Sequence, residues 1–394
     1  MIGKITACLS DQTATHMKVV LSLFTLLSLC MMTANAQQAA GEYHLLIGTY
    51  SSEGKPNGIH VYRFDTRSGE SSSVQPVKEL ANASYLAISK DRKNVYAVSE
   101  GGAASTVNSF AYNSSTGALT FLNSVPAQGP CYVSVDHNKK VVFTGNYGGG
   151  SLLSVPVKSE GSFVTDNVQE IRHEGSSVVK DRQDKPHVHA VVLSPDDRYL
   201  LVPDLGTDKV YQYKVEPGNP QALTPAATPF TSVKPGGGPR HLTFHPNGKY
   251  AYLVLELEAG VMVFDYKDGM LTARQTISMV APDFKGRVSG ADIHVSPDGN
   301  FLYASNRGDA DEIAIFAIDK KGALSLVGRQ SVLGKTPRNF AIDPSGNFLL
   351  AANQNSGEVI IFKRDQKTGL LTATGKKIAV EKPVCLKFVG VGNP

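Results

Sequence analysis

The chain has 394 residues, a formal net charge of +4, 19% charged residues, four cysteines and no tryptophan. Its lysines and arginines are scattered rather than gathered in runs, which argues against a nucleic-acid-binding surface, and no block of charge is typical of a disordered tail. The lack of tryptophan argues against the Trp-Asp class of scaffold repeats.

The first segment of the chain predicts export. Lys18 precedes an apolar run over residues 19–32, and an A-x-A sequence follows at residues 34–36. These are the parts of a secretory signal peptide, and the apolar run is short for a membrane span. We therefore expect residues 1–36 to be an N-terminal extension with a signal peptide, cleaved after Ala36. Residues 37–394 would then form one periplasmic or secreted domain that makes no membrane contact.

After this leader the chain repeats one pattern about every 50 residues. The pattern is an apolar strand, a turn of the Ser/Asp-Pro-Asp-Gly type, and a second apolar strand that ends in a small or polar residue. Self-similarity at a fixed period of this length is the sequence signature of a repeat architecture. The turn prolines of the four clearest copies are spaced by 51, 51 and 47 residues and are Pro195, Pro246, Pro297 and Pro344.

Weaker copies complete the series. Two begin at Tyr85 and Tyr132, and a seventh is divided between residues 43–50 and 384–390 at the two ends of the chain. Each copy continues into a third and a fourth strand with period-2 alternation, and no convincing helix follows residue 36. The sequence thus predicts an all-β fold: a seven-bladed β-propeller with four antiparallel strands per blade, closed by pairing of the N-terminal and C-terminal strands. A long β-sandwich is the alternative, which the sequence repeat disfavours.

The position of two cysteines in this pattern predicts free thiols. Cys131 and Cys385 open the first strands of blades that are not adjacent. Their Cα atoms should therefore be farther apart than the roughly 7 Å that a disulfide allows.

Alignment of the repeats with one another locates a candidate site. The first strand of each blade begins, and the second ends, at the same mouth of the central channel, so residues at these positions should ring that mouth. The opening positions are Ser84, Cys131, His189, Arg240, Ala291, Arg338 and Val384; the closing positions include Glu100, Tyr147, Glu256, Arg307 and Gln354, with Asp204, Asn306 and Asn353 one residue earlier.

The charged residues in this set carry the functional interpretation. A scaffold needs only small or apolar groups at the mouth, and buried charges are costly unless they are paired. Arginine suits carboxylate and phosphate, and histidine can act as a base near neutral pH, so the set predicts an anion-binding pocket with a titratable group beside it. The alternative is a purely structural ring of ion pairs, such as Arg240 with Glu256. His187 and His189 resemble a metal pair without a third ligand, and we expect no metal and no cofactor.

Three segments resemble a known family. The sequences PRHLTFHPNGKYAYLVLEL from Pro239, ADIHVSPDGNFLYASNR from Ala291 and TPRNFAIDPSGNFLLAANQ from Thr336 are similar to the bacterial propeller-type 6-phosphogluconolactonases, a family that includes fungal carboxymuconate lactonising enzymes. The family often has asparagine where this chain has Leu255, and Cys-His-Ser where this chain has residues 188–190. The resemblance implies a seven-bladed lactonase without metal, whose catalytic residues would be His189, Glu256, Arg240 and Arg307.

We expect metal-independent hydrolysis of a small, anionic sugar-acid lactone by a monomer. In this hypothesis Arg240 and Arg307 hold the substrate's anionic group, His189 activates water, and Glu256 orients an arginine or shares the acid–base role. The particular lactone stays open, because 6-phosphogluconolactone arises in the cytosol and export is expected here. The alternatives are a non-catalytic propeller that binds a ligand or protein, and a cyclase of the carboxymuconate type. Further substrate contacts are expected from Arg338, Glu100, Asp204, Asn306, Asn353 and Gln354.

Overall fold

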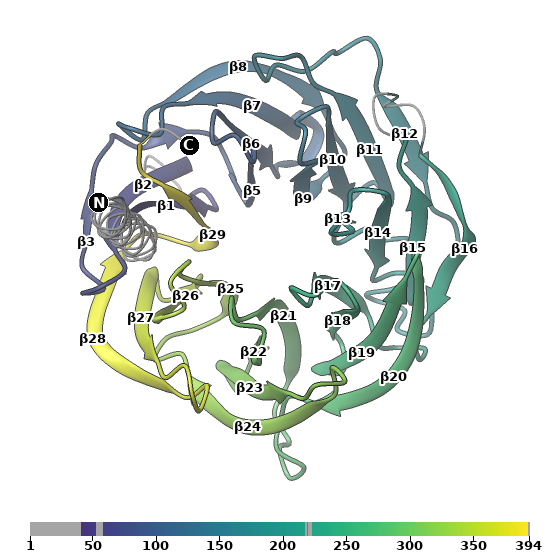
Figure 1. Ribbon diagram of the computed structural model, residues 1–394. Helices are drawn as coiled ribbons and strands as arrows, with labels where there is room; N and C mark the ends of the chain where they lie inside the picture. The colour runs from purple at the N-terminus through teal and green to yellow at the C-terminus, as the bar shows by residue number, and fades with distance from the viewer. Residues whose placement is uncertain (1–40, 53–57, 217–218, 220–222, 393–394) are drawn as a thin grey trace, which may run out of the picture. The chain divides into compact units, whose positions relative to one another are not determined.

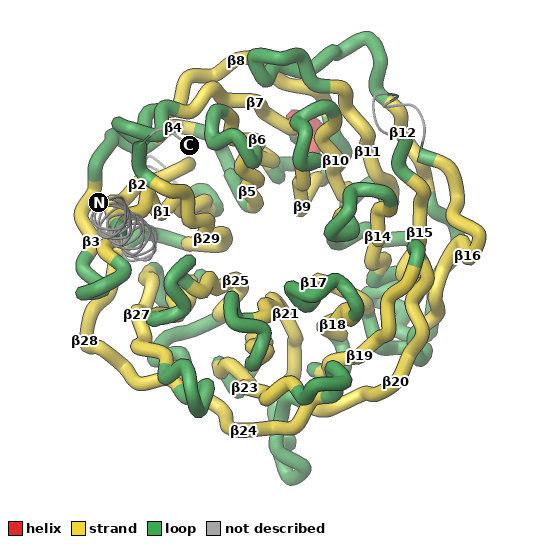
Figure 2. Tube along the Cα trace, viewed as in Figure 1, coloured by secondary structure: helices red, strands yellow, loops and turns green. Residues whose placement is uncertain are grey.

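The computed structural model describes residues 41–52, 58–216, 219 and 223–392 (Figure 1). The predicted signal peptide lies outside these residues. Within them, seven antiparallel sheets stand around a central channel, and almost all regular structure is strand (Figure 2). No helix in these ranges is long and apolar enough to cross a membrane. The predicted seven-bladed propeller is confirmed.

Each blade is a meander of consecutive strands, and its first strand lies nearest the channel. A single 3-10 helix, η1 (Gly102–Ala104), is described in a loop. The first three complete blades are β5 (Tyr85–Ile88), β6 (Asn94–Ser99), β7 (Thr106–Tyr112) and β8 (Leu119–Pro126); β9 (Pro130–Val135), β10 (Val141–Asn146), β11 (Ser151–Pro156) and β12 (Gln169–Arg172); and β13 (Val192–Leu193), β14 (Tyr199–Asp204), β15 (Lys209–Lys214) and β16 (Thr224–Ser232).

The next three blades follow the same order. They are β17 (Pro239–Phe244), β18 (Tyr250–Leu255), β19 (Gly260–Lys267) and β20 (Met270–Ser278); β21 (Val288–Val295), β22 (Phe301–Gly308), β23 (Glu312–Ile318) and β24 (Leu324–Ser331); and β25 (Pro337–Ile342), β26 (Phe348–Asn353), β27 (Glu358–Arg364) and β28 (Leu371–Ala379).

The seventh blade closes the ring, as predicted. The C-terminal strand β29 (Pro383–Gly390) pairs with β1 (Glu42–Thr49), which pairs with β2 (Gly58–Asp65). The outer edge of this blade departs from the four-strand pattern, because β3 (Ser71–Ser73) and β4 (Lys78–Glu79) both pair with β2 at different points. Pairing of the chain ends covers strand edges that would otherwise be exposed.

The repeated turn motif is held together by its own side chains. In the blade of β21 and β22, the Ser296 hydroxyl donates to Asp298 over 2.6 Å, and the backbone N–H of Phe301 donates back to Ser296 over 3.0 Å. Gly299 has a φ of +74°, a conformation that glycine adopts without steric cost. The turn therefore fixes the register of the two strands nearest the channel and thereby the residues at their far ends.

The core lies between neighbouring blades. Tyr252 and Val254 of β18, for example, pack with Ile293 and Leu302 of the next blade, and all four are buried. Cys131 and Cys385 are free, buried thiols. Burial of the apolar faces of every sheet against the next makes the ring a rigid support for the channel mouth.

Strand pairing is irregular at the start of two of the first strands. The ladder shifts register between Pro239 and Leu242 in β17 and between Pro337 and Asn339 in β25. A β-bulge leaves a residue unpaired and re-aims its side chain, and bulges are enriched next to active sites. Arg240 and Arg338 lie in these two irregular stretches.

Candidate active site

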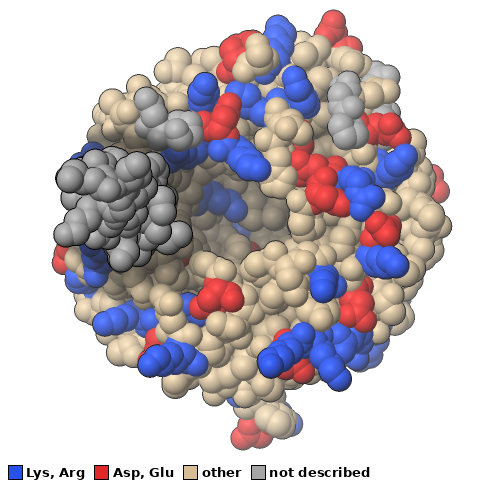
Figure 3. Space-filling view, viewed as in Figure 1, with Lys and Arg blue, Asp and Glu red and all other residues tan. Residues whose placement is uncertain are grey.

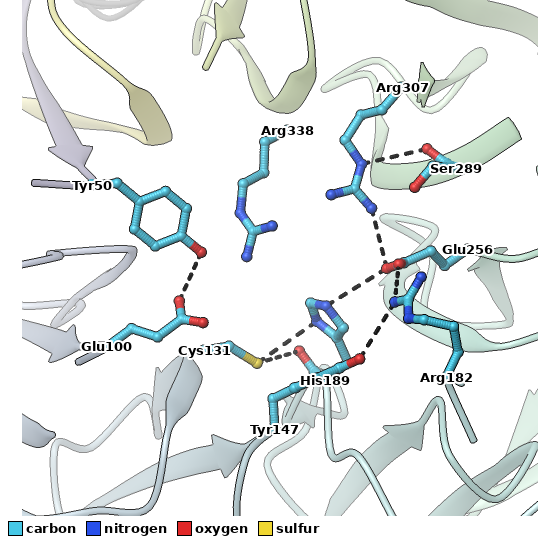
Figure 4. Close-up of a pocket in the computed structure, with 10 residues that line it drawn as sticks. All are labelled: Tyr50, Glu100, Cys131, Tyr147, Arg182, His189, Glu256, Ser289, Arg307 and Arg338. Atoms are coloured by element: carbon cyan, nitrogen blue, oxygen red, sulfur yellow. Dashed lines mark hydrogen bonds and ion pairs between the residues drawn. The ribbon is translucent and has the colours of Figure 1, made fainter. Parts of the chain in front are cut away.

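A pocket of about 360 Å³ lies where the first strands begin and the second strands end (Figure 4). It is close to the lower end of the size range of small-molecule sites. Seen from the face in Figure 3, the centre of the ring is hollow and charges of both signs are scattered around it. The pocket is lined by Tyr50, Glu100, Cys131, Tyr147, Arg182, His189, Glu256, Ser289, Arg307 and Arg338.

Glu256 is surrounded by arginines. Its Oε1 atom lies 2.6 Å from Nη2 of Arg182, and its Oε2 atom lies 2.9 Å from Nε of Arg240 and 3.2 Å from Nη2 of Arg307. Burial alone would raise the pKa of Glu256, but Arg307, Arg240 and Arg182 together lower it to about 2. Glu256 is therefore a permanent carboxylate at neutral pH and is poorly suited to proton transfer.

His189 lies beside this group as a neutral imidazole. Its Nε2 atom is 3.8 Å from Oε2 of Glu256, and its Nδ1 atom is 3.7 Å from Sγ of Cys131. Burial, and next the charge of Arg240, hold the pKa of His189 well below 6.5. Burial likewise raises the pKa of the Cys131 thiol to about 12, so this thiol is a poor nucleophile at neutral pH.

Arg338 is the cation of the pocket without a carboxylate partner in the described part of the chain. Its guanidinium lies 5.1 Å from the ring centre of Tyr50 and extends into the pocket (Figure 4). The Tyr50 hydroxyl donates to Oε2 of Glu100 over 2.8 Å, so the nearby carboxylate is engaged elsewhere. An arginine arranged in this way is available to an anionic ligand group.

Arg307 is less free than Arg338. It donates to the carbonyl oxygens of Ser289 over 3.5 Å and Gly290 over 3.2 Å as well as to Glu256. Burial lowers the pKa of Arg307 to about 9, which leaves it protonated at neutral pH. Its position in the pocket wall is therefore fixed before any ligand binds.

Arg240 lies beneath the pocket rather than in its wall, and it is 1% exposed. Its Nη1 atom donates to the carbonyl of Ala291 over 2.5 Å and lies 3.3 Å from Nε2 of His241. Nδ1 of His241 is in turn 2.8 Å from the carboxylate of Asp292. We expected Arg240 to hold the anionic group of the substrate directly, but in this geometry it does not line the pocket. Arg240 instead binds Glu256 and places a positive charge below His189.

Four expected contact residues are not brought into the pocket. Asp204 is buried and accepts hydrogen bonds from His173 and from the backbone N–H of His187, which makes it a support for the segment before His189. Asn306 accepts from the backbone N–H of Ser289, and Asn353 donates to the carbonyl of Val332. These three side chains and that of Gln354, which donates to Asn355, do not line the pocket. The structure does bring together His189, Glu256, Arg307, Arg338 and Glu100.

Arg182 is a pocket residue that the repeat alignment missed, because it lies outside the repeat. It belongs to the segment 173–191 between β12 and β13, whereas the longest equivalent connection in another blade, 279–287, has about half that length. The buried side chain of Gln183 anchors this segment by accepting from the N–H of Val179 and donating to the carbonyl of Leu205. The unusual length of the segment is the sequence signal that marks it. Tyr50 follows the second strand of the divided blade, at the position equivalent to Glu100, so the repeat could have located it. Ser289 carries no such signal.

Comparisons with known proteins agree with the fold. Residues 44–388 match the family model described as "Lactonase, 7-bladed beta-propeller". The 6-phosphogluconolactonase of Bacillus subtilis (strain 168) is 36% identical over 348 residues, which are 87% of this chain and 97% of that protein. The 6-phosphogluconolactonase of Formosa agariphila is 37% identical over 76% of this chain and 86% of its own length.

A solved structure is similarly close. The periplasmic gluconolactonase of Pseudomonas aeruginosa is 39% identical, with a TM-score of 0.85 over 89% of this chain and 100% of that one. The family match, the two curated relatives and this structure all span nearly the whole propeller. The chain belongs to the family of lactonases with a seven-bladed β-propeller.

Proposed function

We propose that this protein hydrolyses a sugar-acid lactone in the pocket at the channel mouth, without a metal ion. The observation that carries the proposal is the combination of a neutral, buried His189 with an arginine cluster in which Arg338 has no carboxylate partner among the described residues. Within the same ranges, no three His, Cys, Asp or Glu side chains lie close enough together to hold a metal. The lactonase relatives support lactone hydrolysis as the reaction.

His189 is the general base in this mechanism. Glu256 is excluded from that role by its three arginine partners, and Cys131 by its raised pKa. A proton on Nδ1, facing Cys131, leaves the lone pair of Nε2 for water. His189 takes a proton from that water while the water oxygen attacks the lactone carbonyl carbon.

The arginines stabilise the charge that develops. The carbonyl oxygen becomes an oxyanion beside Arg338 and Arg307, where fixed cations in a half-buried pocket act strongly. The bond between the carbonyl carbon and the ring oxygen then breaks, and the imidazolium of His189 returns its proton to the ring oxygen. The product is a hydroxy acid whose carboxylate faces the same two arginines.

The formal charge of the site favours an anionic ligand. Arg182, Arg240, Arg307 and Arg338 contribute four positive charges, and Glu100 and Glu256 contribute two negative ones. The net charge of +2 suits the oxyanion of the transition state and the carboxylate of the hydroxy-acid product. We further propose that the protein acts as a monomer. We also propose that it is exported, since a signal-peptide pattern precedes the propeller and one close relative is periplasmic.

Lactone hydrolysis by the purified protein tests the proposal. The substrates are 6-phosphogluconolactone, glucono-δ-lactone and a carboxymuconolactone, each followed by acid release with and without a chelator, beside His189→Ala. Turnover of one lactone that survives the chelator and is lost in the variant is expected. Loss with chelator would contradict metal independence, and no turnover of any lactone would leave a non-catalytic binding propeller.

A further inference from the structure

A second hollow adjoins the active-site pocket. It has a volume of about 470 Å³ and is lined by Glu100, Gly102, Ala127, Gln128, Gly129, Tyr147 and Gly148, which we call the side pocket. Glu100 and Tyr147 line both hollows. The two hollows therefore share part of their wall, and the side pocket is the space next to a ligand bound in the active-site pocket.

Two loops bonded to each other form part of the wall of the side pocket. The backbone N–H of Gly148 donates to the carbonyl of Gly129 over 3.2 Å, and that of Gly149 donates to the carbonyl of Gln128 over 2.8 Å, so two loops are bonded to each other. A Cβ atom on Gly148 would lie 3.3 Å from the carbonyl oxygen of Gln128. Glycine at this position therefore lets the two loops lie in close contact.

The two hollows differ in charge. Three arginines line the active-site pocket, whereas no lysine or arginine is among the residues that line the side pocket. Its one charged group is Glu100, whose Oε2 atom accepts from Tyr50 and whose Oε1 atom has no hydrogen bond within the described ranges. A carboxylate oxygen in this position accepts hydroxyl groups and repels phosphate.

Tyr147 adds a rigid apolar surface at the junction. Its ring stacks on His187 with a centroid distance of 4.3 Å and an interplanar angle of 20°, and its hydroxyl lies 3.4 Å from Nη2 of Arg182. An aromatic ring beside a carboxylate acceptor is a combination that suits a sugar ring, which offers C–H groups and hydroxyl donors.

We propose that the side pocket binds an uncharged sugar unit attached to the lactone, so that the preferred substrates are lactones of aldonic acids that carry a further neutral glycosyl group. This inference rests on the proposed function, because it places the lactone ring next to His189 with its substituent toward Glu100. It predicts that the end of the substrate far from the carbonyl is neutral. A phosphate at that end would lie beside Glu100 with no cation in the side pocket.

Relative turnover of three lactones tests this inference. For the unmodified protein, kcat/KM for cellobiono-δ-lactone is expected to exceed that for glucono-δ-lactone by about tenfold, the range that a modest set of extra contacts provides. 6-Phosphogluconolactone is expected to be the poorest of the three. Equal or lower kcat/KM for the disaccharide lactone would overturn the inference while leaving lactone hydrolysis intact.

A matched pair of variants localises the effect. Gly102 and Gly375 both have positive φ, +64° and +76°, and a Cβ atom on either would meet nothing within 4 Å. Asparagine tolerates this backbone conformation, so both positions should accept it. Gly102→Asn, in the side pocket, is expected to lower the ratio of the two kcat/KM values about tenfold. Gly375→Asn, on the outer strand β28, should leave both values unchanged, and equal behaviour of the two variants would contradict the inference.

Product binding separates failure of this inference from failure of the proposed function. Calorimetry with cellobionic acid and gluconic acid needs no turnover. Tighter binding of cellobionic acid, weakened by Gly102→Asn, would support the side pocket even if every lactone in the panel were inert. Equal binding of the two acids would overturn it.

Discussion

Replacement of Glu256 by glutamine tests how strongly the arginine cluster depends on one carboxylate. The arginines lower the pKa of Glu256 from 4.5 to about 2, and each pKa unit corresponds to about 1.4 kcal/mol, which gives about 3 kcal/mol of stabilisation by the ionised group. The residue is 4% exposed, so solvent screening reduces this figure little. Glu256→Gln is therefore expected to lower the free energy of unfolding by about 3 kcal/mol at pH 7.

The sign of the pH dependence follows from the lowered pKa. The carboxylate stabilises the folded state fully above the unfolded-state pKa of 4.5, and this contribution is lost as the pH falls toward about 2. The difference between the unmodified protein and Glu256→Gln should therefore shrink below pH 4.5. Urea unfolding followed by circular dichroism at pH 7, 5.5 and 3.5 measures it.

A carboxylate that is paired with an exposed lysine provides the control. Glu358 pairs with Lys377 over 3.0 Å, and the lysine side chain is 61% exposed. Glu358→Gln should change the free energy of unfolding by less than about 1 kcal/mol. If Glu256→Gln also changed the free energy of unfolding by less than about 1 kcal/mol, the reasoning would be refuted. It would equally be refuted if the difference in stability between the unmodified protein and Glu256→Gln stayed constant down to pH 3.5.

Three further predictions concern activity. His189→Ala should lower kcat by about 10²–10⁴-fold if His189 is the base. Because the pKa of His189 is lowered, the acid limb of kcat/KM should lie below pH 6.5. Arg338→Met removes a nearby cation and should raise the pKa of His189, which moves the acid limb to higher pH. The same variant should raise KM for an anionic lactone about tenfold or more. His241→Leu removes an acceptor of Arg240 and should lower kcat roughly 10-fold to 100-fold, with a smaller change in KM, as loss of a supporting contact does.

Each of these has its own contrary result. Unchanged turnover of folded His189→Ala would remove the base from the mechanism, and an unmoved acid limb in Arg338→Met would separate that arginine from His189. His294 also binds Asp292, over 2.8 Å, but is 31% exposed at its side chain and does not contact Arg240. His294→Leu is thus the matched control for His241→Leu, and equal loss in both would indicate a general effect on packing. His241→Gln, which keeps a donor and an acceptor, should restore part of the activity.

The sequence determined the architecture of this protein. Seven copies of one four-strand pattern, one of them divided between the chain ends, are sufficient to specify the blades and the closure, since each sheet must bury its apolar faces against the next. The repeat also located the mouth: His189, Glu256 and Arg307 occupy equivalent ends of channel strands, and alignment found them without knowledge of contacts. Repetition makes such positions predictable because every blade places them at the same height in the ring.

Only the tertiary structure decided how these residues work together. Arg182 enters from a segment outside the repeat. Arg240 is buried below the pocket, where it binds Glu256 and the carbonyl of Ala291, although Arg338 in the equivalent stretch of β25 lines the pocket. Glu256 could act as a base by residue type alone, and three arginines from separate parts of the chain prevent this. These roles depend on the charge and burial contributed by neighbours that are distant in sequence. A pattern that repeats within single blades does not show which of those neighbours meet.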